Sequence, residues 1–216
     1  FIAISNQNFS SFEKICDVEV NIKKTRINDA KVDPYGGIVF GTYNEDQDKL
    51  NRKPIANLYR LAPDLSLTHL LSNITVSNGL AFSQKDNIMY FADTPTGRIQ
   101  KFSYNQDFKK LNELESNMIF KDVGEPDGAT LDNNDNYWSA RVRGKCVICI
   151  DAKNGKIIEK IDLPTSTPTC VTFGNSDLSC LYVTSLRADP INDSADGNLY
   201  KIKTGTQGSK QLLADF

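Results

Sequence analysis

The sequence predicts an all-β fold of the β-propeller type, and three observations support this prediction. One pattern occurs four times in the 216 residues: a polar residue beside a small one, an apolar stretch, a polar turn and a second apolar strand. The repeats lie 50, 49 and 42 residues apart, measured between their leading polar residues, Asn28, Asn78, Asp127 and Thr169. No segment shows a long helical period. Repeats of this length with about four short strands each are typical of propeller blades.

The second strand of each repeat keeps the same phase. Its aligned positions are Phe40, Phe91, Trp138 and Val183, and each is followed by a small residue, namely Gly41, Ala92, Ser139 and Thr184. We expect small residues here because the inner strands of a propeller crowd toward the central axis. A third strand begins near Ala56, Gly97, Gly144 and Gly197, and the intervening polar turns suit hairpins.

The composition excludes several classes of function. Hydrophobic residues make up 39% and charged residues 24% of the chain, as in a soluble globular protein. The 25 basic and 27 acidic residues give a net charge of −2, which argues against a nucleic-acid partner. No apolar run is long enough to span a membrane. The single histidine, His69, excludes a histidine-rich zinc site, so we expect for it a structural or surface role.

The cysteines are predicted to be structural. Cys146 and Cys149 form a C-x-x-C pair, a spacing that can serve zinc binding or redox chemistry. In register with the other repeats they replace apolar residues, and positions i and i+3 of a strand point to opposite faces. We therefore expect both in the core. Five cysteines are an odd number without a disulfide framework, which favours a reducing compartment and predicts a cytoplasmic location.

The leading polar residues of two repeats form a candidate metal site. Equivalent positions of successive blades surround one axis, so Asn78 and Asp127 are expected to face the same channel. Amide and carboxylate oxygens are ligands for hard divalent cations, although two protein ligands are too few and a third carboxylate is expected. The alternative is that Ser77-Asn78-Gly79 and Pro126-Asp127-Gly128 are only turns.

Arg26 and Asn28 form a second candidate pair. They lie two residues apart and therefore share one face of a strand. A guanidinium group beside an amide suits a ligand rich in hydroxyl and carbonyl oxygens. The alternative for Arg26 is an ordinary ion pair with a neighbouring aspartate.

Several motifs, in the right order from about Arg26 to Ile202, resemble those of one family. They read TRINDAKVDPYG, VSNGLAFSQKDNIMYFADT, GEPDGATLDNNDNYW and LPTSTPTCVTFG followed by LYVTS. Together they resemble the regucalcin (senescence marker protein)/gluconolactonase/luciferin-regenerating enzyme family. The resemblance implies a six-bladed propeller that hydrolyses sugar lactones at one divalent-cation site in the central channel.

The resemblance also implies roles for individual residues. The Asn of the family's SNGL motif and the Asp of its PDG motif are metal ligands, which corresponds to Asn78 and Asp127, and Asp127 is also the implied general base. The R-x-N-D motif implies substrate binding by Arg26 and Asn28. Glu45 matches weakly an acidic residue of the substrate pocket in some members.

Two departures from the family pattern affect these expectations. Ala30 stands where the family motif usually has glycine. The remaining metal ligand of the family, a Glu in an early G-E-x-P-x-W motif, is absent upstream of Arg26. Six blades of about 47 residues need about 280 residues, so we interpret residues 1–216 as a single propeller domain that lacks about one and a half N-terminal blades. This chain alone is therefore expected to bind metal weakly and to have little activity.

The predicted function is hydrolysis of a sugar lactone assisted by one divalent cation, Ca²⁺, Zn²⁺, Mg²⁺ or Mn²⁺. Asp127 would accept the proton of the attacking water, and His69 would take no part. The main alternative is a non-enzymatic propeller that binds a metal or another ligand, as in calcium handling. A different ester or lactone substrate is a third possibility, because channel-facing loops such as Tyr43 to Pro54 shape the pocket. The sequence leaves the oligomeric state open.

Overall fold

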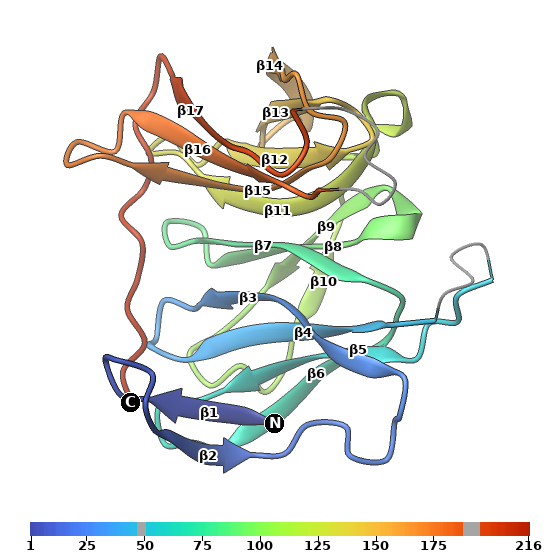
Figure 1. Cartoon of the computed structure of the whole chain (residues 1–216), viewed down its shortest axis with the longest axis vertical. Coiled ribbons are helices and arrows are strands. Elements are labelled where there is room, and N and C mark those ends of the chain that lie inside the picture. Colours follow the sequence, from blue (N-terminus) through green and yellow to red (C-terminus); the bar gives the residue numbers. More distant parts are fainter. Residues whose placement is uncertain (47–50, 188–194) are drawn as a thin grey trace.

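A computed structural model describes residues 1–46, 51–187 and 195–216. The described residues form five antiparallel sheets, each built from strands that are consecutive in the chain. Four of these sheets are blades that follow one another side by side along the molecule (Figure 1). The fifth is a hairpin of β1 (Ile2–Ser5) and β2 (Phe12–Cys16).

Each of the first three blades is a four-stranded meander, and the fourth blade has three strands. The first blade contains β3 (Thr25–Val32), β4 (Ile38–Asn44), β5 (Ala56–Leu61) and β6 (Leu67–Ile74). The second contains β7 (Ser77–Ser83), β8 (Ile88–Asp93), β9 (Arg98–Ser103) and β10 (Asn112–Leu114). The third contains β11 (Glu125–Leu131), β12 (Tyr137–Val142), β13 (Cys146–Asp151) and β14 (Lys156–Asp162). The fourth contains β15 (Pro168–Gly174), β16 (Cys180–Ser185) and β17 (Leu199–Lys203).

The all-β propeller architecture predicted from the repeats is confirmed, but the number of blades differs from six. The described residues form four blades and the additional hairpin. The segment after the hairpin is tied to the first blade by the Glu19 carboxylate, which accepts hydrogen bonds from Thr42 Oγ1 at 3.0 Å and Tyr59 Oη at 3.1 Å. The interpretation of the chain as an incomplete six-bladed propeller stays a prediction.

The first strands of neighbouring blades lie against one another: β7 contacts β3 and β11, and β11 contacts β15. Each first strand carries an irregularity in its pairing with the second strand of the same blade. The register shifts occur between Ile27 and Ala30, Asn78 and Ala81, Pro126 and Ala129, and Pro168 and Cys170. Such bulges re-aim side chains, and all four leading polar residues of the repeats lie at them.

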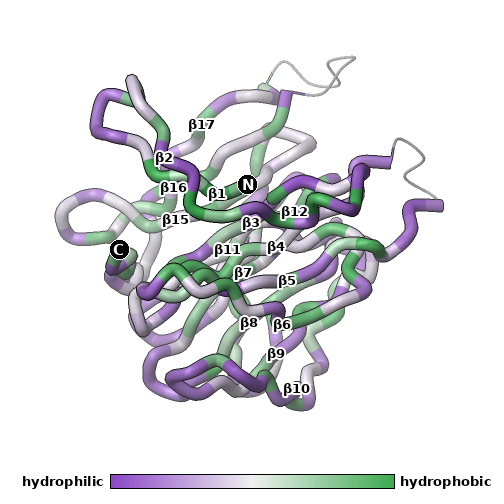
Figure 2. Tube along the Cα trace, turned by 90° about the horizontal axis from the view of Figure 1, so that it is seen from below, coloured by the Kyte–Doolittle hydropathy of each residue, from purple (hydrophilic) through white to green (hydrophobic). Residues whose placement is uncertain are grey.

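Among the described residues, the hydrophobic core forms three clusters, one between each pair of adjacent blades. Figure 2 shows hydrophobic residues along the strands and hydrophilic residues in the loops at the edge. Cys146 belongs to the cluster between the second and third blades, whereas Cys149 belongs to the cluster between the third and fourth. Both thiols are buried and free, so the prediction that they are core residues on opposite strand faces is confirmed.

The small residues after the aromatic position allow close approach between blades. A Cβ atom added at Gly41 of β4 would lie 1.7 Å from Ser77 Oγ of β7, so only glycine fits at this point. The two helices found in the described ranges are 3₁₀ turns of three residues each, η1 (Thr94–Thr96) and η2 (Lys121–Val123). Neither has the length or the apolar character needed to cross a membrane.

Candidate active site in the channel

Side chains about 50 positions apart in the sequence meet at the first strands of the first two blades. Asn28 of β3 donates from Nδ2 to the Asn78 side-chain oxygen at 3.0 Å and to the Ser77 carbonyl oxygen at 2.8 Å. Asn28 is exposed, whereas Asn78 is only 5% exposed. These two leading polar residues of neighbouring repeats, 50 positions apart, are therefore in direct contact.

A threonine links Asn78 to the third blade. Asn78 Nδ2 donates to Thr94 Oγ1 at 2.7 Å, and Thr94 Oγ1 donates to the carbonyl oxygen of Pro126 at 2.9 Å. Pro126 directly precedes Asp127 on β11. The Asn78 side chain and the peptide before Asp127 are thus joined by two consecutive hydrogen bonds across the boundary between the second and third blades.

Asp127 is a partly buried carboxyl group with unbalanced negative charge around it. Burial, and to a smaller extent the Asp29 carboxylate, raises its pKa to about 7, while the N–H of Gly128 has the opposite effect. Within the described part of the chain, no lysine or arginine forms an ion pair with Asp127. A carboxyl group with this pKa can exchange a proton near neutral pH.

Two residues that the sequence analysis did not single out lie on the same strand as Asn28. Asp29 Oδ2 accepts a hydrogen bond from the Leu80 N–H at 3.0 Å, and burial raises the pKa of Asp29 to about 6. Lys31 Nζ lies 3.4 Å from the Ala129 carbonyl oxygen, and burial lowers the pKa of Lys31. The R-x-N-D motif and the strand alternation were the only sequence signals for these two residues.

The chemistry of the donor atoms fits a hard divalent cation. Asn78 supplies an amide oxygen and Asp127 a carboxylate, and the raised pKa of Asp127 reflects the cost of its charge in this environment. A bound cation would offset that cost. Among the described residues, however, no group of three or more His, Cys, Asp or Glu side chains is arranged to hold a metal ion. The third carboxylate expected from the sequence is therefore not found beside these two among the described residues.

Arg26 and Glu45 lie together beside this cluster. Arg26 Nε donates to Glu45 Oε1 at 3.0 Å, and the guanidinium lies over the Tyr43 ring at 4.5 Å from its centroid. The two side chains are 58% and 45% exposed, so both remain accessible to a ligand. Arg26 thus pairs with Glu45 rather than with the adjacent aspartate. The predicted channel loop from Tyr43 to Pro54 lies partly outside the described residues, which omit 47–50.

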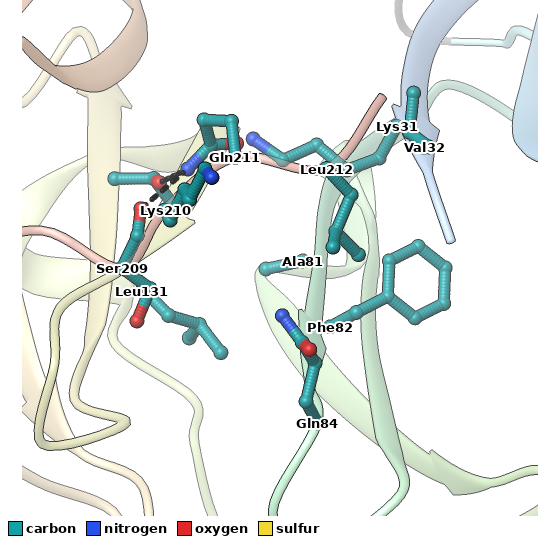
Figure 3. A pocket seen from close by; sticks show the side chains of 11 residues that line it. Lys31, Val32, Ala81, Phe82, Gln84, Leu131, Ser209, Lys210, Gln211 and Leu212 are labelled. Carbon is teal, nitrogen blue, oxygen red and sulfur yellow. Dashed lines mark hydrogen bonds between the residues drawn. The ribbon is translucent and has the colours of Figure 1, made fainter. Parts of the chain in front are cut away.

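A separate pocket occupies the opposite ends of the same first strands (Figure 3). Its walls include Lys31 of β3, Leu131 of β11 and the C-terminal segment from Ser209 to Leu212. Ser209 N donates to the Leu131 carbonyl oxygen at 3.2 Å, and Gln211 Nε2 donates to the Ser209 carbonyl oxygen at 3.2 Å. The C-terminal segment therefore crosses this end of the channel, while Asn78 and Asp127 lie near the N-terminal ends of the strands.

His69 lies away from the channel on β6, the fourth strand of the first blade. It is exposed, and its ring packs edge-on against Tyr59 with the ring centroids 5.4 Å apart. Its Nε2 atom is 3.3 Å from Asn57 Oδ1 and 3.1 Å from Ser72 Oγ. These contacts agree with the surface role predicted for the single histidine.

The fold and the channel residues define a β-propeller whose first strands present a polar site at one end. Residues 1–187 match the family model described as the SMP-30/Gluconolactonase/LRE-like region. The chain therefore belongs to this family, as the motifs indicated.

Two relatives and one solved structure illustrate the similarity. YvrE of Bacillus subtilis (strain 168), provisionally named a sugar lactone lactonase, is 37% identical over 176 residues, covering 81% of this chain and 59% of that protein. The pentonolactonase XacC of Haloferax volcanii is 31% identical over 201 residues, covering 88% of this chain and 67% of that protein. A structure of luciferin-regenerating enzyme has a TM-score of 0.86 at 29% identity, covering 96% of this chain and 71% of that one. The chain thus spans about three fifths to two thirds of the two lactonases.

Proposed function

We propose that the protein hydrolyses a sugar lactone and that a divalent cation in the propeller channel assists the reaction. The observation that carries the proposal is the chain of hydrogen bonds from Asn28 through Asn78 and Thr94 to the peptide before Asp127. It links Asn28, the proposed substrate-binding amide, to the proposed cation ligand Asn78 and to the peptide that precedes the second proposed ligand. The names of YvrE and XacC, which refer to sugar lactone and pentonolactone hydrolysis, support the same substrate class.

Asn78 and Asp127 would hold the cation through their amide and carboxylate oxygens. Ca²⁺, Zn²⁺, Mg²⁺ and Mn²⁺ all accept such ligands. When bound, the cation supplies Lewis-acid chemistry that polarises the lactone carbonyl and lowers the pKa of water.

The protein's own side chains would transfer the proton and orient the substrate. Asp127 accepts a proton from the attacking water. A bond forms between the water oxygen and the carbonyl carbon, the ring C–O bond breaks, and the ring oxygen takes up the proton from Asp127 and leaves as a hydroxyl group. Arg26 and Asn28 orient the carbonyl and hydroxyl oxygens of the sugar. Glu45 holds Arg26 in place and can accept a hydrogen bond from a sugar hydroxyl.

We further propose that the complete propeller has six blades. Exposed apolar side chains lie on or beside the hairpin and the last blade, which supports further packing at both ends; those between 58% and 73% exposed are Phe1, Phe9, Phe12, Val20, Leu186 and Leu199. Additional blades would cover these side chains and supply the acidic ligand that the family motif contains. The 216-residue chain alone is then expected to bind the cation weakly.

The five cysteines are free, which supports the predicted reducing, cytoplasmic environment.

A panel of sugar lactones, assayed with and without a chelator, tests the proposal. The assay uses the 216-residue chain and a form extended by the upstream segment. Asp127→Asn keeps the shape of the side chain and removes its charge, so turnover is expected to fall by about 10²-fold or more. Asp151→Asn, in the same blade but at the end of β13, is the matched control and should hydrolyse at the wild-type rate. Unchanged turnover in the Asp127→Asn variant would refute the mechanism.

The non-enzymatic alternative predicts a different result from the same experiment. A binding propeller would take up the cation, with Asp127→Asn weakening that binding, yet the extended form would hydrolyse none of the lactones. Calorimetry with CaCl₂ and MnCl₂ alongside the panel therefore separates the two functions.

A further inference from the structure

We propose that Asp29 is a positioning residue: its carboxylate holds the bulge of β7 and thereby fixes the orientation of Asn78. This inference deepens the proposed function and rests on it for the role of Asn78 as a cation ligand. Asp29 itself would touch neither the cation nor the lactone. Its effect would reach the site through the backbone of the second blade.

The side chains of Asn28 and Asp29 form hydrogen bonds with the β7 backbone on the two sides of Asn78. The Asn28 side chain binds the Ser77 carbonyl oxygen at 2.8 Å, immediately before Asn78, and Asp29 Oδ2 binds the Leu80 N–H at 3.0 Å, two residues after it. In a regular strand, adjacent side chains point to opposite faces and could not both do this. The bulge of β3 between Ile27 and Ala30 makes the double contact possible.

The third blade restrains the same bulge from the other side. Tyr137 Oη donates to the Gly79 carbonyl oxygen at 2.8 Å, and Tyr137 is fully buried. Gly79 has a φ of +68°, and a Cβ atom there would lie 2.5 Å from Tyr137 Oη. The glycine is thus required for the turn, but it is also the most flexible residue type. External hydrogen bonds are therefore needed to hold one conformation.

The Asp29 bond is the restraint most sensitive to mutation. Leu80 is 1% exposed, so water cannot replace the carboxylate as the acceptor for its N–H. Hydrogen bonds to charged acceptors are also stronger than those between neutral groups. The same carboxylate also contributes to the raised pKa of Asp127. Lys31, two residues further along β3, balances part of the Asp29 charge.

Two substitutions separate positioning from charge. Asp29→Asn removes the charge but leaves a side-chain oxygen that can accept from Leu80 N–H, whereas Asp29→Ala removes both. We expect the Leu80 amide to exchange at least about tenfold faster in Asp29→Ala and the dissociation constant for Ca²⁺ to rise about tenfold. In Asp29→Asn both values should stay within about threefold of wild type. Amide exchange is measured by NMR on the full chain, and affinity by calorimetry with CaCl₂.

Asp151→Ala is the matched control because Asp151 Oδ1 also accepts a backbone N–H, that of Lys153, at 2.9 Å. It should change neither Leu80 exchange nor Ca²⁺ affinity. Equal weakening of Ca²⁺ binding in Asp29→Asn and Asp29→Ala would show that charge, not the hydrogen bond, matters and would overturn the proposal. Unchanged Leu80 exchange in Asp29→Ala would overturn it as well.

The proposed function can fail separately. If wild-type protein binds no Ca²⁺ and hydrolyses no lactone, the side-chain NH₂ resonances of Asn78 still report its orientation. Displacement of these resonances in Asp29→Ala, with recovery in Asp29→Asn, would support positioning by Asp29. Their persistence at wild-type positions in both variants would exclude it.

Discussion

Replacing Thr94 by valine tests whether the channel cluster is held together by the hydroxyl group that joins the second and third blades. Thr94 Oγ1 accepts from Asn78 Nδ2 at 2.7 Å and donates to the Pro126 carbonyl oxygen at 2.9 Å. Valine has nearly the same shape as threonine, but its side chain neither donates nor accepts hydrogen bonds. The substitution therefore deletes two hydrogen bonds while changing the packing little.

The expected magnitude follows from the burial of the groups left behind. Each deleted hydrogen bond contributes about 0.5–1.5 kcal/mol net, and a buried group without a partner costs about 1–3 kcal/mol. Asn78 is 5% exposed and Pro126 is buried, so water replaces the hydroxyl poorly. We expect Thr94→Val to lower the free energy of unfolding by about 2 kcal/mol. Because the Asn78 amide loses one of its two side-chain partners, cation affinity should also fall.

Urea denaturation with a matched control makes the test specific. Thr96 belongs to the same 3₁₀ turn, donates to the Asp93 carbonyl oxygen at 2.7 Å and accepts from Arg98 N–H at 3.2 Å, but it is exposed. Water reaches the exposed Thr96 side chain but the partner residue Asp93 is 8% exposed, so Thr96→Val should cost about 1 kcal/mol or less, about half the loss in Thr94→Val. A loss in Thr96→Val as large as that in Thr94→Val, or no loss in either, would refute the reasoning.

Two further predictions concern the contact between the third and fourth blades. Gly128→Ala should lower the free energy of unfolding by about 1–3 kcal/mol, because the new methyl group would lie 2.9 Å from the Cα atom of Cys170. Gly205→Ala is the control and should be neutral, because a Cβ atom there has nothing within 4 Å. Similar melting temperatures for the two variants would contradict this prediction. The Cys170 thiol, although the residue is exposed, should react with iodoacetamide about a hundredfold more slowly at pH 8 than an unperturbed cysteine, because burial of the thiol and the Asp29 carboxylate raise its pKa to about 11. Mass spectrometry of the Cys170 peptide should show the rate rising with pH up to about 11, and a rate that levels off below pH 10 would count against this environment.

The repeat spacing was sufficient to predict the propeller and the closeness of equivalent positions on neighbouring blades, of which Asn28 and Asn78 are an example, whereas the shared cation site of Asn78 and Asp127 stays a prediction. A period of 50 residues places equivalent positions on adjacent first strands whatever the details of each blade. The prediction needs no knowledge of side-chain contacts. The spacing relates neighbouring blades only, so it does not predict how many blades a complete ring has. The described residues form four blades.

The contributions of Asp29 and Thr94 could not be predicted in the same way. Strand periodicity places Asp29 on the face opposite Asn28, and only the register shift between Ile27 and Ala30 allows both to reach β7. Thr94 lies outside the strands, in a 3₁₀ turn whose position depends on how the second blade meets the third. The positions of bulges and turns depend on how the blades pack against one another. The periodic pattern of a single sequence does not reveal this packing.

The hydrogen bonds that hold the proposed site together also connect neighbouring blades. The geometry of the site therefore depends on how the blades pack. Asn28 and Asp29 join the first blade to the second, and Thr94 joins the second to the third. A shift of one blade relative to its neighbour must therefore move the oxygen of Asn78 relative to the carboxylate of Asp127. Packing of further blades against the exposed ends would restrain such shifts, so closing the ring should raise cation affinity even before the blades add a ligand. Under the six-blade proposal, a form that carries the further blades, with alanine at the acidic position of the G-E-x-P-x-W motif that the family resemblance implies, should then bind Ca²⁺ more tightly than the 216-residue chain, and equal affinities would show that closure contributes nothing.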